Sequence, residues 1–269
     1  VSRQIMNVMS EDISPEDWKK IGNEVYPYLE DDKISGIVIT HGTDTMHFTS
    51  AALSFFLDSN KPIIITGSQR SVDRGSSDAF MNLKCAILAA AEMKAGEVYV
   101  VMHATSNDDY CFIHKGTKVR KMHTTRRDAF KTINGNPIAK IFPNGKIEMM
   151  EEYISPKKPK KQIGFGKVGM LRVYPGISPD IIDYFIQNKY EGLVIEGTAL
   201  GHIPTKGKMS FESWIKKAID SGMVIVISTQ TVFGSTNKYV YANLRKLSIK
   251  LGCIFVDGML SETAYVKLG

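Results

Sequence analysis

The sequence predicts two α/β domains, each built on a parallel β-sheet, with the larger domain at the N-terminal end. Apolar runs of strand length alternate with helix-length amphipathic segments, a pattern typical of βαβ units with parallel strands. A stretch rich in proline and lysine at 151–163 divides this alternation. The 269 residues, 43% of them hydrophobic, can bury one large or two small cores. We therefore expect a first domain at 1–150, a linker at 151–165 and a second domain at 166–269.

The first part of the chain begins with a helix and then alternates strands with helices. Apolar residues between 17 and 29 recur at helical spacing. Runs of β-branched residues predict strands at 36–40 and 63–66. The remaining predicted elements are a buried helix at 48–57, an alanine-rich helix at 78–94 capped by Ser77, and a strand at 98–102.

The second part repeats this alternation after the linker. Its predicted strands are 168–173, 191–196 and 223–228. One helix opens at 178–180 with proline in its first turn, a second spans 210–221, and a third lies around 239–250. Strands that alternate with helices in this way predict a second parallel sheet.

Residues 104–135 interrupt the regular pattern. They are polar and rich in basic residues, and the segment is too long for an ordinary connection. We expect this segment to be a functional excursion. The lysines of the linker either contact an acidic partner or are simply solvated.

Composition narrows the class of protein. The net charge of +6 and pI near 9 indicate an acidic partner such as nucleic acid, or a mildly basic chain without one. The three cysteines lie far apart and lack metal-finger spacing, which argues against a disulfide framework. No apolar run is long enough to cross a bilayer, and no signal peptide is visible. We expect a cytoplasmic protein without a membrane partner or a bound metal.

The most reactive set of side chains is His-Gly-Thr-Asp-Thr at 41–45, directly after the predicted strand 36–40. Ligands of open α/β sheets bind at this end of the strands. Thr43 becomes a nucleophile, or activates water, when a base takes its proton, and a lysine of the excursion can be that base. Asp44 can orient the lysine or pair with a substrate ammonium. A polar turn at a strand end can equally be structural.

Several segments resemble the L-asparaginase family. The similarity lies in the HGTDT turn, in KPIIITGSQR from Lys61, in SDAFMNL from Ser77 and in KMHTT from Lys121. It also includes NVMSED near the start and DGML near the end, so it spans nearly the whole chain in order. The resemblance implies an asparaginase-type fold and amide hydrolysis.

The resemblance assigns roles to individual residues. Thr43 matches the second catalytic threonine and Lys121 its lysine partner, with Asp44 bridging them and binding the substrate α-ammonium. The first family signature, Thr-Gly-Gly-Thr-Ile, carries the other threonine and does not occur in residues 1–269. We expect the chain, which begins with Val1, to be a fragment with little glutaminase activity alone. A catalytically incomplete scaffold is the other explanation.

Three further positions match the substrate-binding residues of the family. Ser10 would bind the α-carboxylate, Glu11 would contact the amino end, and Ser68 would place its backbone against the side-chain amide. Each has a structural alternative: a helix-capping turn residue for Ser10, a first-turn charge for Glu11, and a plain turn residue for Ser68. The family pattern makes His41 a packing residue. The glycine-rich turn 197–201 would belong to the smaller domain, which in the family closes an active site on a neighbouring subunit; a plain strand-to-helix turn is the alternative.

Within this family the chain is most similar to the glutaminase subunits of archaeal tRNA-dependent amidotransferases, on Ser106–Cys111, His114–His123 and Arg126–Phe130. That resemblance implies glutamine as substrate and ammonia delivery to a kinase/transamidase partner subunit. The partner would use ATP and Mg²⁺ to convert Glu-tRNA(Gln) to Gln-tRNA(Gln), with no cofactor in this chain. A homodimer is expected. The alternative is a free-standing asparaginase.

Overall fold

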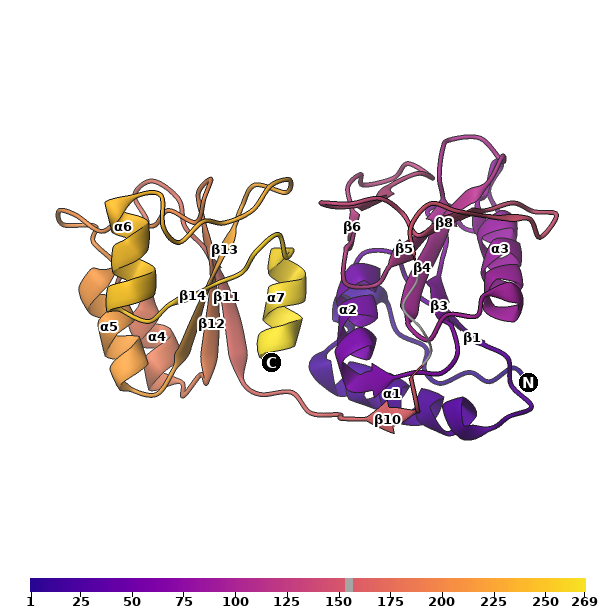
Figure 1. Ribbon diagram of the computed structural model, residues 1–269, viewed down its shortest axis with the longest axis horizontal. Helices are drawn as coiled ribbons and strands as arrows, with labels where there is room; N and C mark the ends of the chain where they lie inside the picture. The colour runs from indigo at the N-terminus through magenta and orange to yellow at the C-terminus, as the bar shows by residue number, and fades with distance from the viewer. Residues whose placement is uncertain (153–156) are drawn as a thin grey trace. The chain divides into compact units, whose positions relative to one another are not determined.

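The computed structural model describes residues 1–152 and 157–269, which form two compact units, 1–164 and 165–269 (Figure 1). Each unit has its own sheet and its own core. Residues 153–156 belong to the linker predicted at 151–165 and lie outside the described residues. The two-domain α/β architecture expected from the sequence is confirmed.

The first unit contains a six-stranded sheet in the order β1-β3-β4-β5-β8-β9. Its strands are β1 (Ile37–Thr40), β3 (Ile63–Thr66), β4 (Val98–His103), β5 (Cys111–Lys115), β8 (Ala139–Ile141) and β9 (Ile147–Met149). The first three are parallel, as the βαβ pattern predicts, and all residues of β3 and β4 are buried. The other three run antiparallel to their neighbours, which the sequence does not predict.

Helices cover both faces of this sheet (Figure 1). On one side lie α1 (Pro15–Glu30) and α2 (Met46–Phe56), and on the other lies α3 (Ala79–Glu92). A capping box begins α1, because Ser14 and Asp17 bond reciprocally and Pro15 occupies the first turn. The short 3-10 turn η1 (Ser10–Asp12) precedes it.

The basic excursion at 104–135 is not a plain loop, because it contains three short strands. Besides β5 it contains the antiparallel hairpin of β6 (Val119–Lys121) and β7 (Phe130–Thr132). These strands escape the sequence analysis because they are short and carry polar and charged residues. The predicted linker also contains a strand, β10 (Lys160–Lys161), which pairs with β2 (Leu57–Asp58) of the same unit.

The second unit contains a four-stranded parallel sheet in the order β11-β12-β13-β14. Its strands are β11 (Val168–Arg172), β12 (Gly192–Gly197), β13 (Val224–Thr229) and β14 (Ile254–Phe255). One face carries α4 (Ile181–Gln187), α5 (Glu212–Asp220) and α6 (Ala242–Arg245), and the other carries α7 (Ser261–Leu268) (Figure 1). The helix predicted around 239–250 is shorter and ends in a π-helical turn, Lys246–Lys250.

A groove of about 760 Å³ lies along β1, which is an outer strand of its sheet. Apolar side chains of β1, α1 and α3 line it, and it extends to His41 and Gly42. The turn that follows β1 is therefore open to a groove on one side. Within the described residues, no helix is both long enough and apolar enough to cross a membrane.

Candidate active site

The turn at 41–45 joins β1 to α2 and is built around close backbone contacts. A Cβ on Gly42 would lie 2.7 Å from Ser10 Cβ, so glycine is needed for Ser10 to pack there. The Thr45 hydroxyl donates to the Ser10 carbonyl at 2.6 Å, and the Asp44 amide donates to Ser10 Oγ at 3.3 Å. Ser10 is buried and lies against the turn, and its role in binding the α-carboxylate remains a prediction.

Lys121 ends strand β6 and reaches this turn from far away in the sequence. Its Nζ donates to Thr43 Oγ1 at 2.9 Å and pairs with Asp44 Oδ1 at 2.6 Å. The Lys121 side chain is 12% exposed and the Asp44 side chain 60%, so the group is anchored on one side and open on the other. The structure thus brings together the three residues predicted to be catalytic. We call Thr43, Asp44 and Lys121 the threonine–lysine cluster.

Gln69 completes this cluster, and the sequence analysis did not single it out. Thr43 Oγ1 donates to Gln69 Oε1 at 2.8 Å, and Gln69 Nε2 donates to the Arg126 carbonyl at 3.0 Å. Two sequence signals point to Gln69. It lies in the turn that follows the predicted strand 63–66, where neighbouring parallel strands end at the same edge of a sheet, and it belongs to the KPIIITGSQR segment of the family resemblance.

The turn after β3 abuts the turn after β1. A Cβ on Gly67 would lie 2.2 Å from the His41 carbonyl oxygen, so the two backbones touch. Ser68 follows directly and is half-buried, whereas Glu11 is exposed next to Ser10. Within the described part of the chain, neither the Ser68 nor the Glu11 side chain makes a hydrogen bond or ion pair. Their predicted roles in substrate binding remain predictions.

A buried carboxylate holds the loop that carries Gln69. Asp78 is fully buried and accepts hydrogen bonds from the backbone amides of Gln69 at 3.0 Å and Arg70 at 2.9 Å. It also accepts one from Asn82 Nδ2 at 2.9 Å. Asp78 rather than the predicted Ser77 occupies the cap position of α3. One side chain thus fixes both ends of the 67–78 loop.

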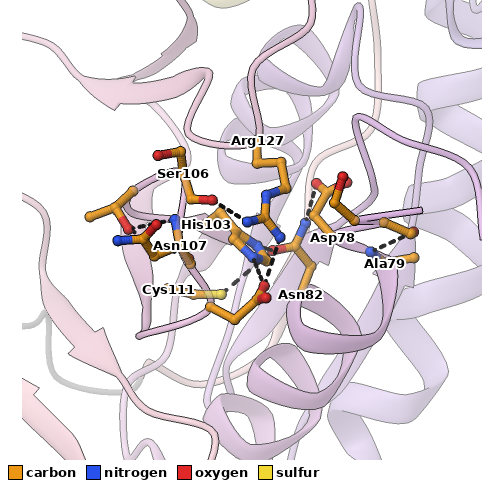
Figure 2. A network of polar contacts seen from close by, with 12 residues as sticks. Asp78, Ala79, Asn82, His103, Ser106, Asn107, Cys111 and Arg127 are labelled. Carbon is orange, nitrogen blue, oxygen red and sulfur yellow. Dashed lines mark hydrogen bonds and ion pairs between the residues drawn. The ribbon is translucent and has the colours of Figure 1, made fainter. Parts of the chain in front are cut away.

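The same contacts continue into a network around a buried histidine (Figure 2). His103 Nδ1 lies 2.6 Å from Asn82 Oδ1, and its Nε2 lies 3.0 Å from Asp108 Oδ1. Arg127 pairs with Asp108 at 2.7 Å and also donates to the Ser106 carbonyl. The hydrogen bond from His103 and the nearby Arg127 lower the pKa of the Asp108 carboxyl. We call Asp78, Asn82, His103 and Asp108 the histidine network.

Two other histidines have structural surroundings. His41 Nε2 lies 2.9 Å from Thr49 Oγ1 on α2 and its Nδ1 lies 2.6 Å from the Gly42 carbonyl, so the ring packs between its own turn and α2. Burial lowers the pKa of His41. His114 on β5 is completely buried and bonds Thr132 Oγ1 on β7 at 2.7 Å. Burial, together with nearby Lys131, lowers the pKa of His114 to about 3.

The second unit presents polar groups at the carboxyl ends of its own strands. Arg172 pairs with the buried Glu196 at 3.0 Å, and Gln230 bonds the carbonyls of Val173 and Glu196. In the turn at 197–201, Gly197 lies against Gly201 with no room for a Cβ. Among the described residues, no three His, Cys, Asp or Glu side chains gather closely enough to hold a metal ion.

Comparisons with known proteins match this chain along almost its full length. The sequence profile described as "Asparaginase, N-terminal" matches residues 1–155, and that of the "Glutaminase/Asparaginase C-terminal domain" matches residues 167–269. Proteins named as one of the subunits of glutamyl-tRNA(Gln) amidotransferase are 48% identical in Pyrococcus horikoshii and 46% in Thermococcus kodakarensis, each over 98% of this chain. The protein of the same name from Methanosphaera stadtmanae is 44% identical over 99% of this chain.

These relatives are longer than the chain, which spans 60% of the length of each of the three. Among solved structures, the thermostable L-asparaginase from Thermococcus kodakarensis matches with a TM-score of 0.89 and 30% sequence identity. That match covers 98% of this chain and 77% of the asparaginase.

Proposed function

The chain belongs to the asparaginase family, and from this membership we propose that it hydrolyses glutamine for a tRNA-dependent amidotransferase. The observation that carries the proposal is the contact of Lys121 Nζ with Thr43 Oγ1 at 2.9 Å and with Asp44 at 2.6 Å. A hydroxyl within hydrogen-bond reach of a lysine that a carboxylate orients is the arrangement an activated nucleophile needs. The relatives at 44–48% identity support the amidotransferase.

The proposed chemistry begins with a proton transfer. Lys121, as the neutral amine, takes the Thr43 hydroxyl proton while Asp44 holds the lysine in place. The Thr43 oxygen then attacks the carbon of the substrate's side-chain amide. Alternatively, it takes a proton from the hydroxyl of the other family threonine, and that hydroxyl oxygen attacks. A C–O bond forms, the C–N bond breaks, and ammonia leaves with the proton held by Lys121. Water hydrolyses the resulting threonine ester and releases glutamate.

The proposed substrate contacts surround this cluster. The exposed carboxylate of Asp44 would pair with the α-ammonium, and Ser10 would bind the α-carboxylate. Glu11 would lie at the amino end, and the Ser68 backbone would face the side-chain amide. Backbone N–H groups of such turns can stabilise the oxyanion that forms during attack.

We further propose that the ammonia passes to a kinase/transamidase partner subunit. That partner would hold ATP and Mg²⁺ and convert Glu-tRNA(Gln) to Gln-tRNA(Gln), while this chain contributes no cofactor. The chain would pair as a homodimer, with the smaller domain, which holds the turn at 197–201, closing the site of the other copy. The name shared by the longer relatives supports the amidotransferase complex in general.

The test uses the full-length protein together with its partner subunit and Glu-tRNA(Gln). Thr43→Val keeps the shape of the side chain but removes its hydroxyl, so glutamine hydrolysis should fall by at least about 10³-fold. The matched control is Thr40→Val, because Thr40 is exposed at the end of β1 and makes no side-chain hydrogen bond among the described residues. Retained hydrolysis in Thr43→Val would reject the proposed site.

A free-standing asparaginase is the second candidate, favoured by the 0.89 TM-score to a thermostable L-asparaginase. The two functions separate by substrate and by dependence on the complex. Glutaminase activity that rises with partner and charged tRNA supports the amidotransferase. Efficient asparagine hydrolysis by the full-length protein alone would favour the asparaginase instead.

A further inference from the structure

We propose that Gln69 is a positioning residue that fixes the direction of the Thr43 hydroxyl proton and ties Thr43 to the loop that follows Lys121. This inference rests on the proposed function, because it concerns the same amide hydrolysis. Gln69 contacts Thr43 Oγ1, the Arg126 carbonyl and Asp78, in three separate segments of the chain.

The orientation of the Gln69 amide follows from its partners. The Arg126 carbonyl can only accept a hydrogen bond, so the group 3.0 Å away must be the NH₂ of Gln69. The amide oxygen therefore faces Thr43 Oγ1 at 2.8 Å. Because that oxygen can only accept, the Thr43 hydroxyl must donate to it.

Lys121 approaches the same hydroxyl from another direction. Its ammonium pairs with Asp44 at 2.6 Å and donates to Thr43 Oγ1 at 2.9 Å. Thr43 thus presents a lone pair to Lys121 and its proton to Gln69. In this resting arrangement the proton points away from the base that must take it. The hydroxyl can donate to Lys121 only after the lysine has lost a proton and the O–H has turned from Gln69.

Gln69 is itself held rigidly enough to act in this way. The buried Asp78 carboxylate accepts from the Gln69 backbone amide at 3.0 Å. The bond to Arg126 then joins the 67–78 loop to the loop that immediately follows Lys121. The lysine and the threonine come from segments 78 residues apart, and Gln69 contacts both segments. It therefore sets the Thr43 Oγ1 position relative to Lys121 Nζ.

The consequences can be measured as a split between kcat and KM. Gln69→Met has similar length but neither hydrogen-bonding group, so we expect kcat for glutamine to fall about tenfold while KM changes less than about twofold. The fall in kcat follows from the lost tether between Thr43 and the loop after Lys121. The lost acceptor has a separate effect, because a Thr43 hydroxyl that is no longer bonded to Gln69 can donate to the neutral lysine and so favours the neutral form. The ascending limb of the kcat–pH profile should therefore move to lower pH. A residue with only a structural role would not move this limb.

Two further variants are needed. One separates the bond to Thr43 from the bond to the Arg126 carbonyl, and the other is a control for replacing a glutamine with methionine. Gln69→Glu keeps the acceptor for Thr43 but loses the donor to the Arg126 carbonyl, so its kcat should lie between those of wild type and Gln69→Met. Gln187→Met alters an exposed glutamine on α4 and should leave kcat, KM and the pH profile unchanged. All variants are made in the full-length protein and assayed with its partner subunit.

The outcomes distinguish this inference from the proposed function. If Thr43→Val keeps its activity, the proposed function fails. If Thr43→Val is inactive but Gln69→Met keeps the wild-type kcat and pH profile, the positioning role of Gln69 is wrong. A rise in KM alone would make Gln69 a substrate contact and would equally overturn the inference. If Gln69→Met does not fold, Gln69→Glu provides the test. An unchanged kcat in Gln69→Glu would show that the hydrogen bond from Gln69 to the Arg126 carbonyl does not position Thr43.

Discussion

Two groups of polar residues lie at the carboxyl ends of β1, β3 and β4, and they differ in how far their side chains are exposed to solvent. In the threonine–lysine cluster, the Asp44 side chain is 60% exposed, so the cluster can receive a ligand. In the histidine network, Asp78, Asn82 and His103 are completely buried, and each accepts or donates only within the protein (Figure 2). The buried group fixes loops and the open group is available for chemistry. Residue types alone do not distinguish them, since both contain aspartate.

The largest expected effect is on the open cluster. Lys121→Met keeps most of the side chain but removes the proposed base, so glutamine turnover should fall by about 10³-fold or more with the melting temperature nearly unchanged. The control is Lys115→Met, which removes a lysine of β5 that pairs with Glu97 instead. If Lys121→Met lost stability but kept its glutamine turnover, Lys121 would have a structural role like that of the histidine network and would not be the base.

The next effect concerns the buried group. Asp78→Ala would leave two backbone amides without their acceptor and would remove one of the two acceptors of Asn82 Nδ2, so the free energy of unfolding should fall by about 3 kcal/mol. Asp73→Ala removes an exposed aspartate from the same loop and should change the free energy of unfolding by less than about 0.5 kcal/mol. Urea denaturation measures both. Equal losses in the two variants would contradict the anchoring role of Asp78.

A pH series tests the buried bond from His114 to β7, the strand that pairs with the Lys121 strand β6. The pKa of His114 is about 3 in the folded protein and 6.5 ordinarily, so the unfolded chain binds a proton first as the pH falls. This contribution to stability is complete above pH 6.5 and is lost progressively toward pH 3. Between about pH 7 and pH 4 the loss is about 3 kcal/mol. His114→Asn should flatten the dependence of unfolding free energy on pH. An unchanged slope would show that His114 is accessible to protons.

The smallest effect belongs to the exposed end of the histidine network. The pKa of Asp108 is lowered by His103 and Arg127, so its stabilising charge is present above the ordinary carboxyl pKa and disappears as the pH falls through its folded value. Because 66% of the side chain is exposed, Asp108→Asn should cost less than about 1 kcal/mol at about pH 7. Thermal unfolding measures the difference, which should shrink as the solution is made more acidic than the ordinary carboxyl pKa. If Asp108→Asn lost as much unfolding free energy as Asp78→Ala, burial would not explain the difference between the two aspartates of the histidine network.

The sequence was sufficient for the parallel part of the fold. β-branched runs predicted β1, β3, β12 and β13 because buried parallel strands are apolar along their whole length. The antiparallel strands β5 to β9 were not predicted, since each is only three to five residues long and carries at least one charged residue. Lys160 and Lys161 have the composition of a linker, yet they pair with β2. Backbone pairing there does not depend on side-chain type.

The candidate site was predicted unevenly. The turn at 41–45 stood out by its chemistry alone, but spacing could not choose Lys121 among the lysines of the excursion. That choice came from family resemblance, and the 2.9 Å contact with Thr43 agrees with it. Gln69 and most of the histidine network lie in segments that carry the family resemblance, yet they were missed because neither their residue types nor the resemblance assigned them a role. Their roles arise only when the fold brings residues 69, 78 and 126 together.

The backbone contact between Gly67 and the His41 carbonyl has a thermodynamic consequence for ligand binding. Two turns that touch without intervening side chains have few rotamers to lose when a substrate arrives. The entropy of ordering them is lost once, when the chain folds, and not again at each binding event. Their stiffness is therefore a property of the empty site, and the heat of binding should report substrate contacts rather than rearrangement of these two turns.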